Sequence, residues 1–128
     1  MKPYAAYAIG AALIDTEIQV TDNQLQAMNI EKGMMTLVDQ ARQAEMLSEL
    51  SEHLVRASHA SGGSAGNSMI ATALMGGPTY MSCKVAHDDD GDIYLADLEQ
   101  SGVAHGLNDQ RKEGVTGKCI VLITPDAE

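Results

Sequence analysis

Apolar, strand-like runs alternate with segments of helical periodicity along this chain, and that alternation constrains its fold more than any other feature. Tyr4 to Ile14 is apolar except for Gly10, as expected for a strand covered on both faces of a sheet. Asp39 to Leu50 carries apolar residues at three- and four-residue spacing, which predicts an amphipathic helix. Strands that alternate with helices in this way predict an α/β sheet.

The second half of the chain continues the same alternation. Three consecutive aspartates precede one of its predicted helices, where carboxylates cap free N–H groups and meet the positive end of the helix dipole. Gly and Pro residues follow another helix and end it. The expected elements are a strand at His53–His59, a helix at Met69–Met75, a strand at Thr79–Ala86, a helix at Gly91–Gln100 and a strand at Lys118–Thr124.

Some segments do not fit a helix-covered core. From Glu17 to Asp22 polar and apolar residues alternate, which predicts a half-exposed strand. Met34 to Val38 offers a second short strand. We therefore expect one domain over residues 1–128, in which lid strands at about 17–38 and 115–124 lie against an α/β core.

Composition excludes several classes of partner. The 128 residues are enough for one compact domain. A net charge of -10, from 18 acidic and 8 basic residues, argues against a nucleic-acid or anionic lipid partner. The longest apolar run, which ends at Ile14, is too short to span a membrane. Cys83 and Cys119 form no CxxC pair, so the sequence predicts a reduced cytoplasmic setting without a zinc site or disulfide.

Four short stretches stand in a recognisable order. A strand ends in Asp15; a glycine pair is followed four residues later by Asn; a Lys-Val-x-x-Asp-x-x-Gly helix start comes next; and a Thr-Gly precedes the last strand. The stretches are Ile9–Asp15, Ser61–Asn67, Lys84–Gly91 and Gly114–Gly117. Together they resemble the N-terminal part of the ribokinase-like (PfkB) family of carbohydrate and nucleoside kinases. Gly-Gly-Ser-Ala-x-Asn is most similar to the adenosine-kinase-like branch.

The resemblance implies a fold and a binding site. The fold is a ribokinase-like three-layer α/β core, partial in this chain, with a small β-sheet lid. The family transfers the terminal phosphate of ATP to a primary hydroxyl of a sugar or nucleoside, assisted by Mg²⁺. By resemblance, Asp15 accepts hydrogen bonds from ring hydroxyls of the acceptor, Asn67 contacts one of them, and Gly62 and Gly63 let the backbone approach the sugar closely.

The family's second motif is absent from the sequence. That motif, Gly-Ala-Gly-Asp, supplies the catalytic base and the N–H groups that hold the transferred phosphate. Gly91-Asp92 lacks the preceding Gly-Ala pair, so no residue of this chain is assigned to catalysis. We therefore expect a chain truncated before the catalytic motif, inactive alone, and holding neither the ATP nor the Mg²⁺ of the complete enzyme.

Two other interpretations stay open. The chain fits a self-contained, non-catalytic protein that binds a sugar or nucleoside or that pairs through its lid. Self-association through the lid or through the edge of Lys118–Thr124 is expected in either case. Asp88-x-Asp90-x-Asp92 with Glu99 at the twelfth position suggests a calcium loop, but Ile93 occupies the sixth position, where the turn needs glycine.

Overall fold

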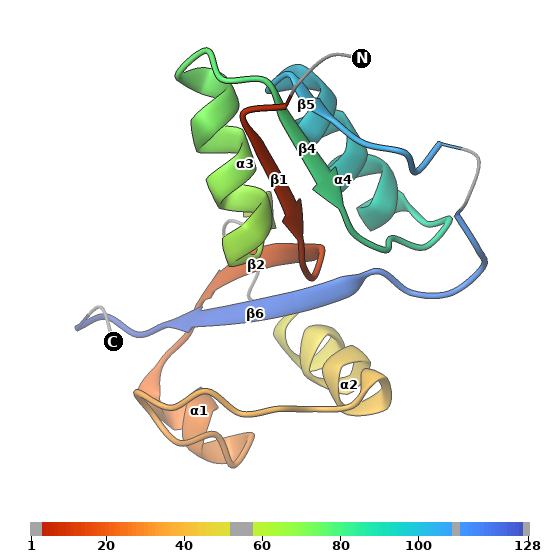
Figure 1. Ribbon diagram of the computed structural model, residues 1–128. Helices are drawn as coiled ribbons and strands as arrows, with labels where there is room; N and C mark the ends of the chain where they lie inside the picture. The colour runs from red at the N-terminus through yellow and green to blue at the C-terminus, as the bar shows by residue number, and fades with distance from the viewer. Residues whose placement is uncertain (1–3, 52–57, 109–110, 127–128) are drawn as a thin grey trace. The chain divides into compact units, whose positions relative to one another are not determined.

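The computed structural model of this chain describes residues 4–51, 58–108 and 111–126 (Figure 1). It consists of two compact units. The first unit comprises Met1–Asp15 and His59–Cys119, and the second comprises Thr16–Ser58 and Ile120–Glu128. In chain order the elements are β1 (Ala6–Ile9), β2 (Leu13–Gln19), α1 (Asp22–Ala27), α2 (Gln40–Leu50), β3 (Ser58–Gly62), α3 (Ser64–Leu74), β4 (Thr79–Ser82), α4 (Asp89–Gln100), β5 (Val103–Ala104) and β6 (Gly117–Ile123).

The first unit is built on a parallel sheet of order β1-β4-β5. Parallel strands need crossover connections, and helix α4 joins β4 to β5 (Figure 1). Ala6 and Ala8 of β1 and Met81 of β4 pack in one core with residues of α3 and α4. The buried members of this core are Ala12, Ile14, Met69, Met81, Val85, Tyr94, Leu95, Leu98 and Val103. The predicted α/β class is confirmed.

The opposite face of this sheet is exposed in the first unit. Alternate residues of a strand point to opposite faces, so Tyr7 and Ile9 lie away from the core and are 58% and 80% exposed. The Tyr7 and Tyr80 rings stack there, with centroids 5.1 Å apart. The prediction of one strand from Tyr4 to Ile14 covered on both faces is therefore wrong, because β1 ends at Ile9 and β2 begins at Leu13. The predicted strand end at Asp15 is also wrong, since Asp15 lies within β2.

The second sheet has the strand order β3-β2-β6. Along β2, Ile14, Thr16 and Ile18 are buried, whereas Glu17 and Gln19 are exposed. The half-exposed strand predicted at Glu17–Asp22 is therefore present as far as Gln19, but it begins earlier, at Leu13, and Asp22 begins α1 instead. The predicted last strand is also confirmed, as β6.

The second unit contains a short helix, α1, that the sequence did not predict. A capping box formed by Thr21 and Gln24 begins it. Helix α2 was expected, and the Asp39 carboxylate caps it by accepting from the Arg42 N–H at 2.8 Å. The core of this unit comprises Ile18, Val20, Leu25, Met28 and Leu50.

The predicted strand at Met34–Val38 is wrong, because the segment has no regular secondary structure. Met35 and Leu37 are 88% and 91% exposed. A short apolar run becomes a strand only where a neighbouring strand takes up its backbone hydrogen bonds. The apolar spacing that predicts α2 includes Ala44 on its inner face, but Ala44 is exposed and Met46 is buried.

The remaining elements differ from prediction mainly at their ends. The strand expected at His53–His59 is β3, which runs from Ser58 to Gly62; residues 52–57 lie outside the described part of the chain. Strand β4 ends at Ser82 rather than at Ala86. Of the helices within the described ranges, none is both long enough and apolar enough to cross a bilayer.

Candidate functional site

The carboxylate of Asp15 lies directly against the backbone of Gly62. Asp15 is a half-buried residue of β2, and Gly62 is the buried last residue of β3. A Cβ added to Gly62 would lie 2.5 Å from both Cγ and Oδ1 of Asp15, which is far inside contact distance. Glycine therefore allows the strand to pass the carboxylate, and the structure brings together the two residues that the sequence singled out.

Gly63 places the start of α3 beside the same strand. It is the N-cap residue of α3, with a φ of 90°, a conformation that favours glycine. A Cβ on Gly63 would also lie 2.6 Å from the carbonyl oxygen of Ala11. The β3–α3 turn is thus pressed against the residues that lead into β2 and Asp15.

The first turn of α3 offers free donors near the glycine pair. The N–H groups of the first turn of a helix have no partner within that helix, and Gly63 provides no side-chain cap. The Asn67 N–H donates to the Gly63 carbonyl at 2.9 Å, and Asn67 is exposed. The site therefore combines an acceptor, the Asp15 carboxylate, with donors at a helix N-terminus.

Cys119 is a neighbour of this site that the sequence did not indicate. Burial raises the pKa of the Cys119 thiol, and the negative charge of Asp15 raises it further. The residue lies in β6 and remains exposed. Cys119 belongs to no local cysteine motif, and its relation to Asp15 comes from the pairing of β2 with β6.

A second cluster joins two of the stretches that carry the family resemblance. Asp88 Oδ1 accepts hydrogen bonds from the Gly91 N–H at 2.8 Å and from the Thr116 hydroxyl at 2.6 Å. Its Oδ2 accepts from the Thr116 N–H at 2.8 Å. The Thr116 hydroxyl oxygen in turn accepts from the Ala86 N–H at 3.0 Å. Asp88 caps α4 as predicted, and it also holds Thr116.

Burial of Asp88 acts to raise its pKa, but the hydrogen bonds from Thr116 and Gly91 and the charge of Lys118 outweigh burial and lower it. Arg111 reinforces the loop around this carboxylate, since its Nε donates to the Ala86 carbonyl at 2.9 Å. Arg111 Nη1 also pairs with Asp92 at 2.6 Å. The cluster is thus a network of charged and backbone hydrogen bonds in the first unit.

The calcium-loop alternative does not agree with the structure. Asp89 to Gln100 is a continuous helix rather than a loop. Asp90 is paired with Lys118, and Asp92 with Arg111. In the part of the chain that the structure describes, no group of three or more His, Cys, Asp or Glu side chains could hold a metal ion. The described residues of this segment therefore do not fit a calcium or Mg²⁺ site.

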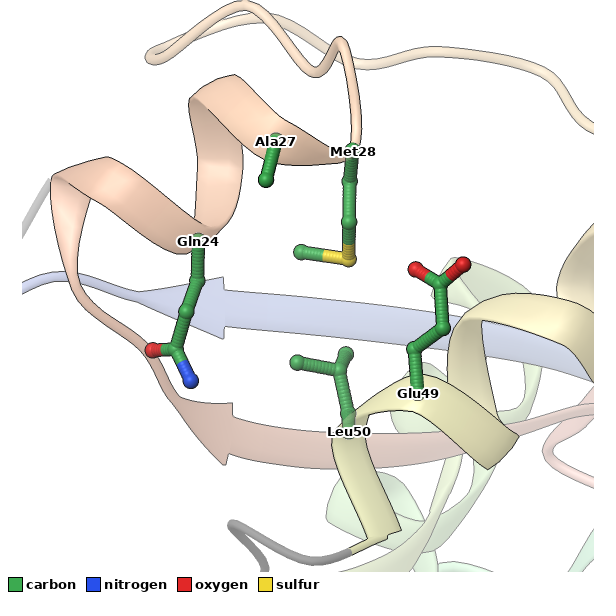
Figure 2. A pocket seen from close by; sticks show the side chains of 5 residues that line it. All are labelled: Gln24, Ala27, Met28, Glu49 and Leu50. Atoms are coloured by element: carbon green, nitrogen blue, oxygen red, sulfur yellow. The ribbon is translucent and has the colours of Figure 1, made fainter.

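A small cleft lies in the second unit between α1 and the end of α2 (Figure 2). Its volume is about 160 Å³, below the range of roughly 300–1,000 Å³ usual for ligand pockets. It is lined by Gln24, Ala27, Met28, Glu49 and Leu50. None of the predicted site residues lines it, so it is not the candidate site.

Solved kinases share this fold. The crystal structure of a probable sugar kinase protein from Rhizobium etli CFN 42 matches with a TM-score of 0.79 and 31% sequence identity, over 98% of this chain and 37% of that chain. Adenosine kinase from Sinorhizobium meliloti matches with a TM-score of 0.78 and 33% identity, over 96% of this chain and 36% of that chain. Adenosine kinase from Anopheles gambiae, in complex with P1,P4-di(adenosine-5) tetraphosphate, has a TM-score of 0.79 and 21% identity, over 97% of this chain and 39% of that chain. The fold is therefore that of the ribokinase-like kinases, as the sequence predicted.

A family model confirms the assignment at the level of sequence. The model described as pfkB family carbohydrate kinase matches residues 21–128. The chain belongs to the pfkB family of carbohydrate kinases. It spans 37% of the Rhizobium etli kinase and 36% of the Sinorhizobium meliloti enzyme.

Proposed function

We propose that this chain is the acceptor-binding part of an ATP-dependent sugar or nucleoside kinase that phosphorylates a primary hydroxyl. One observation carries the proposal: the Asp15 carboxylate lies against Gly62, which is followed directly by Gly63 and the start of α3. Family membership supports the reaction class. The similarity to a probable sugar kinase and to adenosine kinases supports the acceptor class.

Each site residue has a role that its chemistry suits. A carboxylate accepts protons from two hydroxyls at once, so Asp15 binds a pair of ring hydroxyls. The free N–H groups at the start of α3 donate to hydroxyl oxygens, and the Asn67 amide can donate to one of them or accept from it. Gly62 and Gly63 let the β3–α3 turn pack against Asp15 and Ala11, which keeps the turn beside the carboxylate that binds the sugar. A ring with neighbouring hydroxyls matches this combination of acceptor and donors.

Isothermal titration calorimetry with adenosine, inosine, ribose and fructose tests the binding role. We expect the chain to bind at least one of these compounds, and Asp15→Asn to weaken that binding at least about tenfold, because a charged hydrogen bond contributes roughly 1.5–3 kcal/mol. Asp89→Asn is the matched control, since Asp89 is an exposed carboxylate in the first turn of α4. Equal affinities for wild type and Asp15→Asn would contradict the assigned role.

The chemical step is a separate question. Phosphoryl transfer depends on positioning and on groups that stabilise the transferred phosphate, and the sequence lacks the Gly-Ala-Gly-Asp motif that supplies them in this family. We therefore infer that the 128-residue chain alone does not phosphorylate an acceptor. Formation of ADP together with a phosphorylated sugar or nucleoside, from the purified chain with ATP and Mg²⁺, would contradict this inference.

A further inference from the structure

Asp88 makes more contacts than a helix cap requires. An N-cap carboxylate needs one oxygen to accept from the first turn of its helix, and Asp88 Oδ1 does this for Gly91. The other oxygen, Oδ2, accepts from the backbone N–H of Thr116, which is 28 residues away in the sequence. The Thr116 hydroxyl donates to Oδ1 at the same time. Asp88 therefore fixes both the backbone and the side chain of Thr116.

Thr116 stands immediately before β6, and the start of β6 is packed against the entry to β2. A Cβ on Gly117 would lie 2.9 Å from Leu13 Cδ2 and 3.0 Å from the Ala12 carbonyl oxygen. Gly63 packs just as closely on the preceding residue, Ala11. The short segment from Ala11 to Leu13 is thus held between the glycine pair and the start of β6, and it runs directly into the strand that carries Asp15.

We propose that Asp88 is a positioning residue for acceptor binding, acting through Thr116 and Gly117 on the segment that leads to Asp15. The inference rests on the proposed function. It differs from a purely structural role for Asp88, because it requires the Thr116 contact as well as the helix cap. The site carboxylate is then oriented by a loop that itself touches no acceptor.

Asp88→Asn separates the two roles. If the amide oxygen takes the place of Oδ1, the variant keeps the acceptor for the Gly91 N–H and for the Thr116 hydroxyl. Its amide NH₂ then faces the Thr116 N–H, and two donors cannot form a hydrogen bond. Asn is itself a good N-cap residue, so the start of α4 is preserved while the contact to the Thr116 backbone is lost.

The test compares acceptor affinity with local amide exchange in the 128-residue chain. We expect Asp88→Asn to weaken binding of the acceptor identified by calorimetry about tenfold, to speed exchange of the Thr116 amide, and to leave the Gly91 amide protected. Thr116→Ser, which keeps the hydroxyl, is expected to bind like wild type. Asp39→Asn is the control for a carboxylate that only caps a helix, because Asp39 accepts from the Arg42 N–H at the start of α2. This variant is expected to leave the affinity for the acceptor unchanged.

The outcomes separate this inference from the function on which it rests. If wild type binds an acceptor and Asp88→Asn binds it equally well, the positioning role is wrong and the proposed function stands. The positioning role is also wrong if the Thr116 and Gly91 amides lose protection together, because that marks loss of the whole helix start. If wild type binds none of the sugars or nucleosides, the proposed function is wrong, and the positioning role of Asp88 is wrong with it.

Discussion

Replacing Gly62 by alanine tests the closest contact of the candidate site. The new Cβ would lie 2.5 Å from Cγ and Oδ1 of Asp15, so either the carboxylate or strand β3 must move. Overpacking of this kind costs roughly 1–3 kcal/mol. For a chain of this size, each kcal/mol lowers the melting temperature by about 3–6 °C. We expect Gly62→Ala to be destabilised by this amount and to lose acceptor binding.

A double-mutant cycle tests whether Asp15 is the residue with which the new Cβ overlaps. Urea unfolding followed by circular dichroism gives the stability of Gly62→Ala, Asp15→Ala and the double variant. Because Asp15→Ala removes the carboxylate, the second substitution should restore most of the lost stability, with a coupling energy of about 1–2 kcal/mol. Asp15→Asn is nearly isosteric with Asp and should not restore it. Additive effects in the cycle would refute the contact.

Three further predictions follow from individual contacts and surfaces. Among the described residues, the buried Tyr94 hydroxyl has no hydrogen-bond partner. Tyr94→Phe should therefore raise the urea midpoint and increase the free energy of unfolding by about 1 kcal/mol. A lower midpoint would show that the hydroxyl does have a partner. Lys32 donates to Asp126 and lowers the pKa of that carboxyl from 3.8 to about 2. The difference in unfolding free energy between wild type and Lys32→Gln should therefore be largest above pH 3.8 and disappear as the pH falls towards 2. A difference that does not depend on pH would argue against the pair. The exposed apolar face of β1 and the edge of β6 predict dimers or larger species at micromolar concentration, whereas a monomer of 13.6 kDa in light scattering would contradict self-association.

Local sequence patterns predicted the helices and strands that depend on periodicity and on capping residues close in the sequence. Helix α2 follows from its periodicity and its Asp39 cap, and α4 from the carboxylates before it. The buried and exposed residues of β2 follow from simple alternation. Helix α1 was not predicted, because it is only six residues long and mostly polar. Its one indication in the sequence is the capping pair Thr21 and Gln24.

The errors concern burial, which depends on neighbours distant in the sequence. The apolar run through Tyr7 and Ile9 predicted a strand buried on both faces, yet the described chain covers only one face of β1. The run from Met34 to Val38 is similarly apolar but has no strand beside it. Composition cannot reveal whether a partner layer or partner strand is present, so such runs are predicted as buried by default.

For the candidate site, the family pattern indicated Asp15 and Gly62, and the structure supplies their contact. The tie between Asp88 and Thr116 was not predicted, because nothing in the local sequence relates a helix cap to a loop 28 residues later. The run of aspartates before α4 predicts a helix cap and nothing more. The structure adds that Asp88 is half-buried and contacts Thr116.

The exposed face of the β1-β4-β5 sheet gives the protein a built-in optical probe. The chain has 4 tyrosines and no tryptophan or phenylalanine. Tyr4 and Tyr7 each lie within 5.3 Å of Tyr80, measured between ring centroids, and are exposed, whereas Tyr94 is fully buried in the core. With no tryptophan to accept their excitation energy, three of the four tyrosines emit from this one face. Anything that covers the face, whether a second copy of the chain or more polypeptide, will register as a change in intrinsic tyrosine fluorescence without any label.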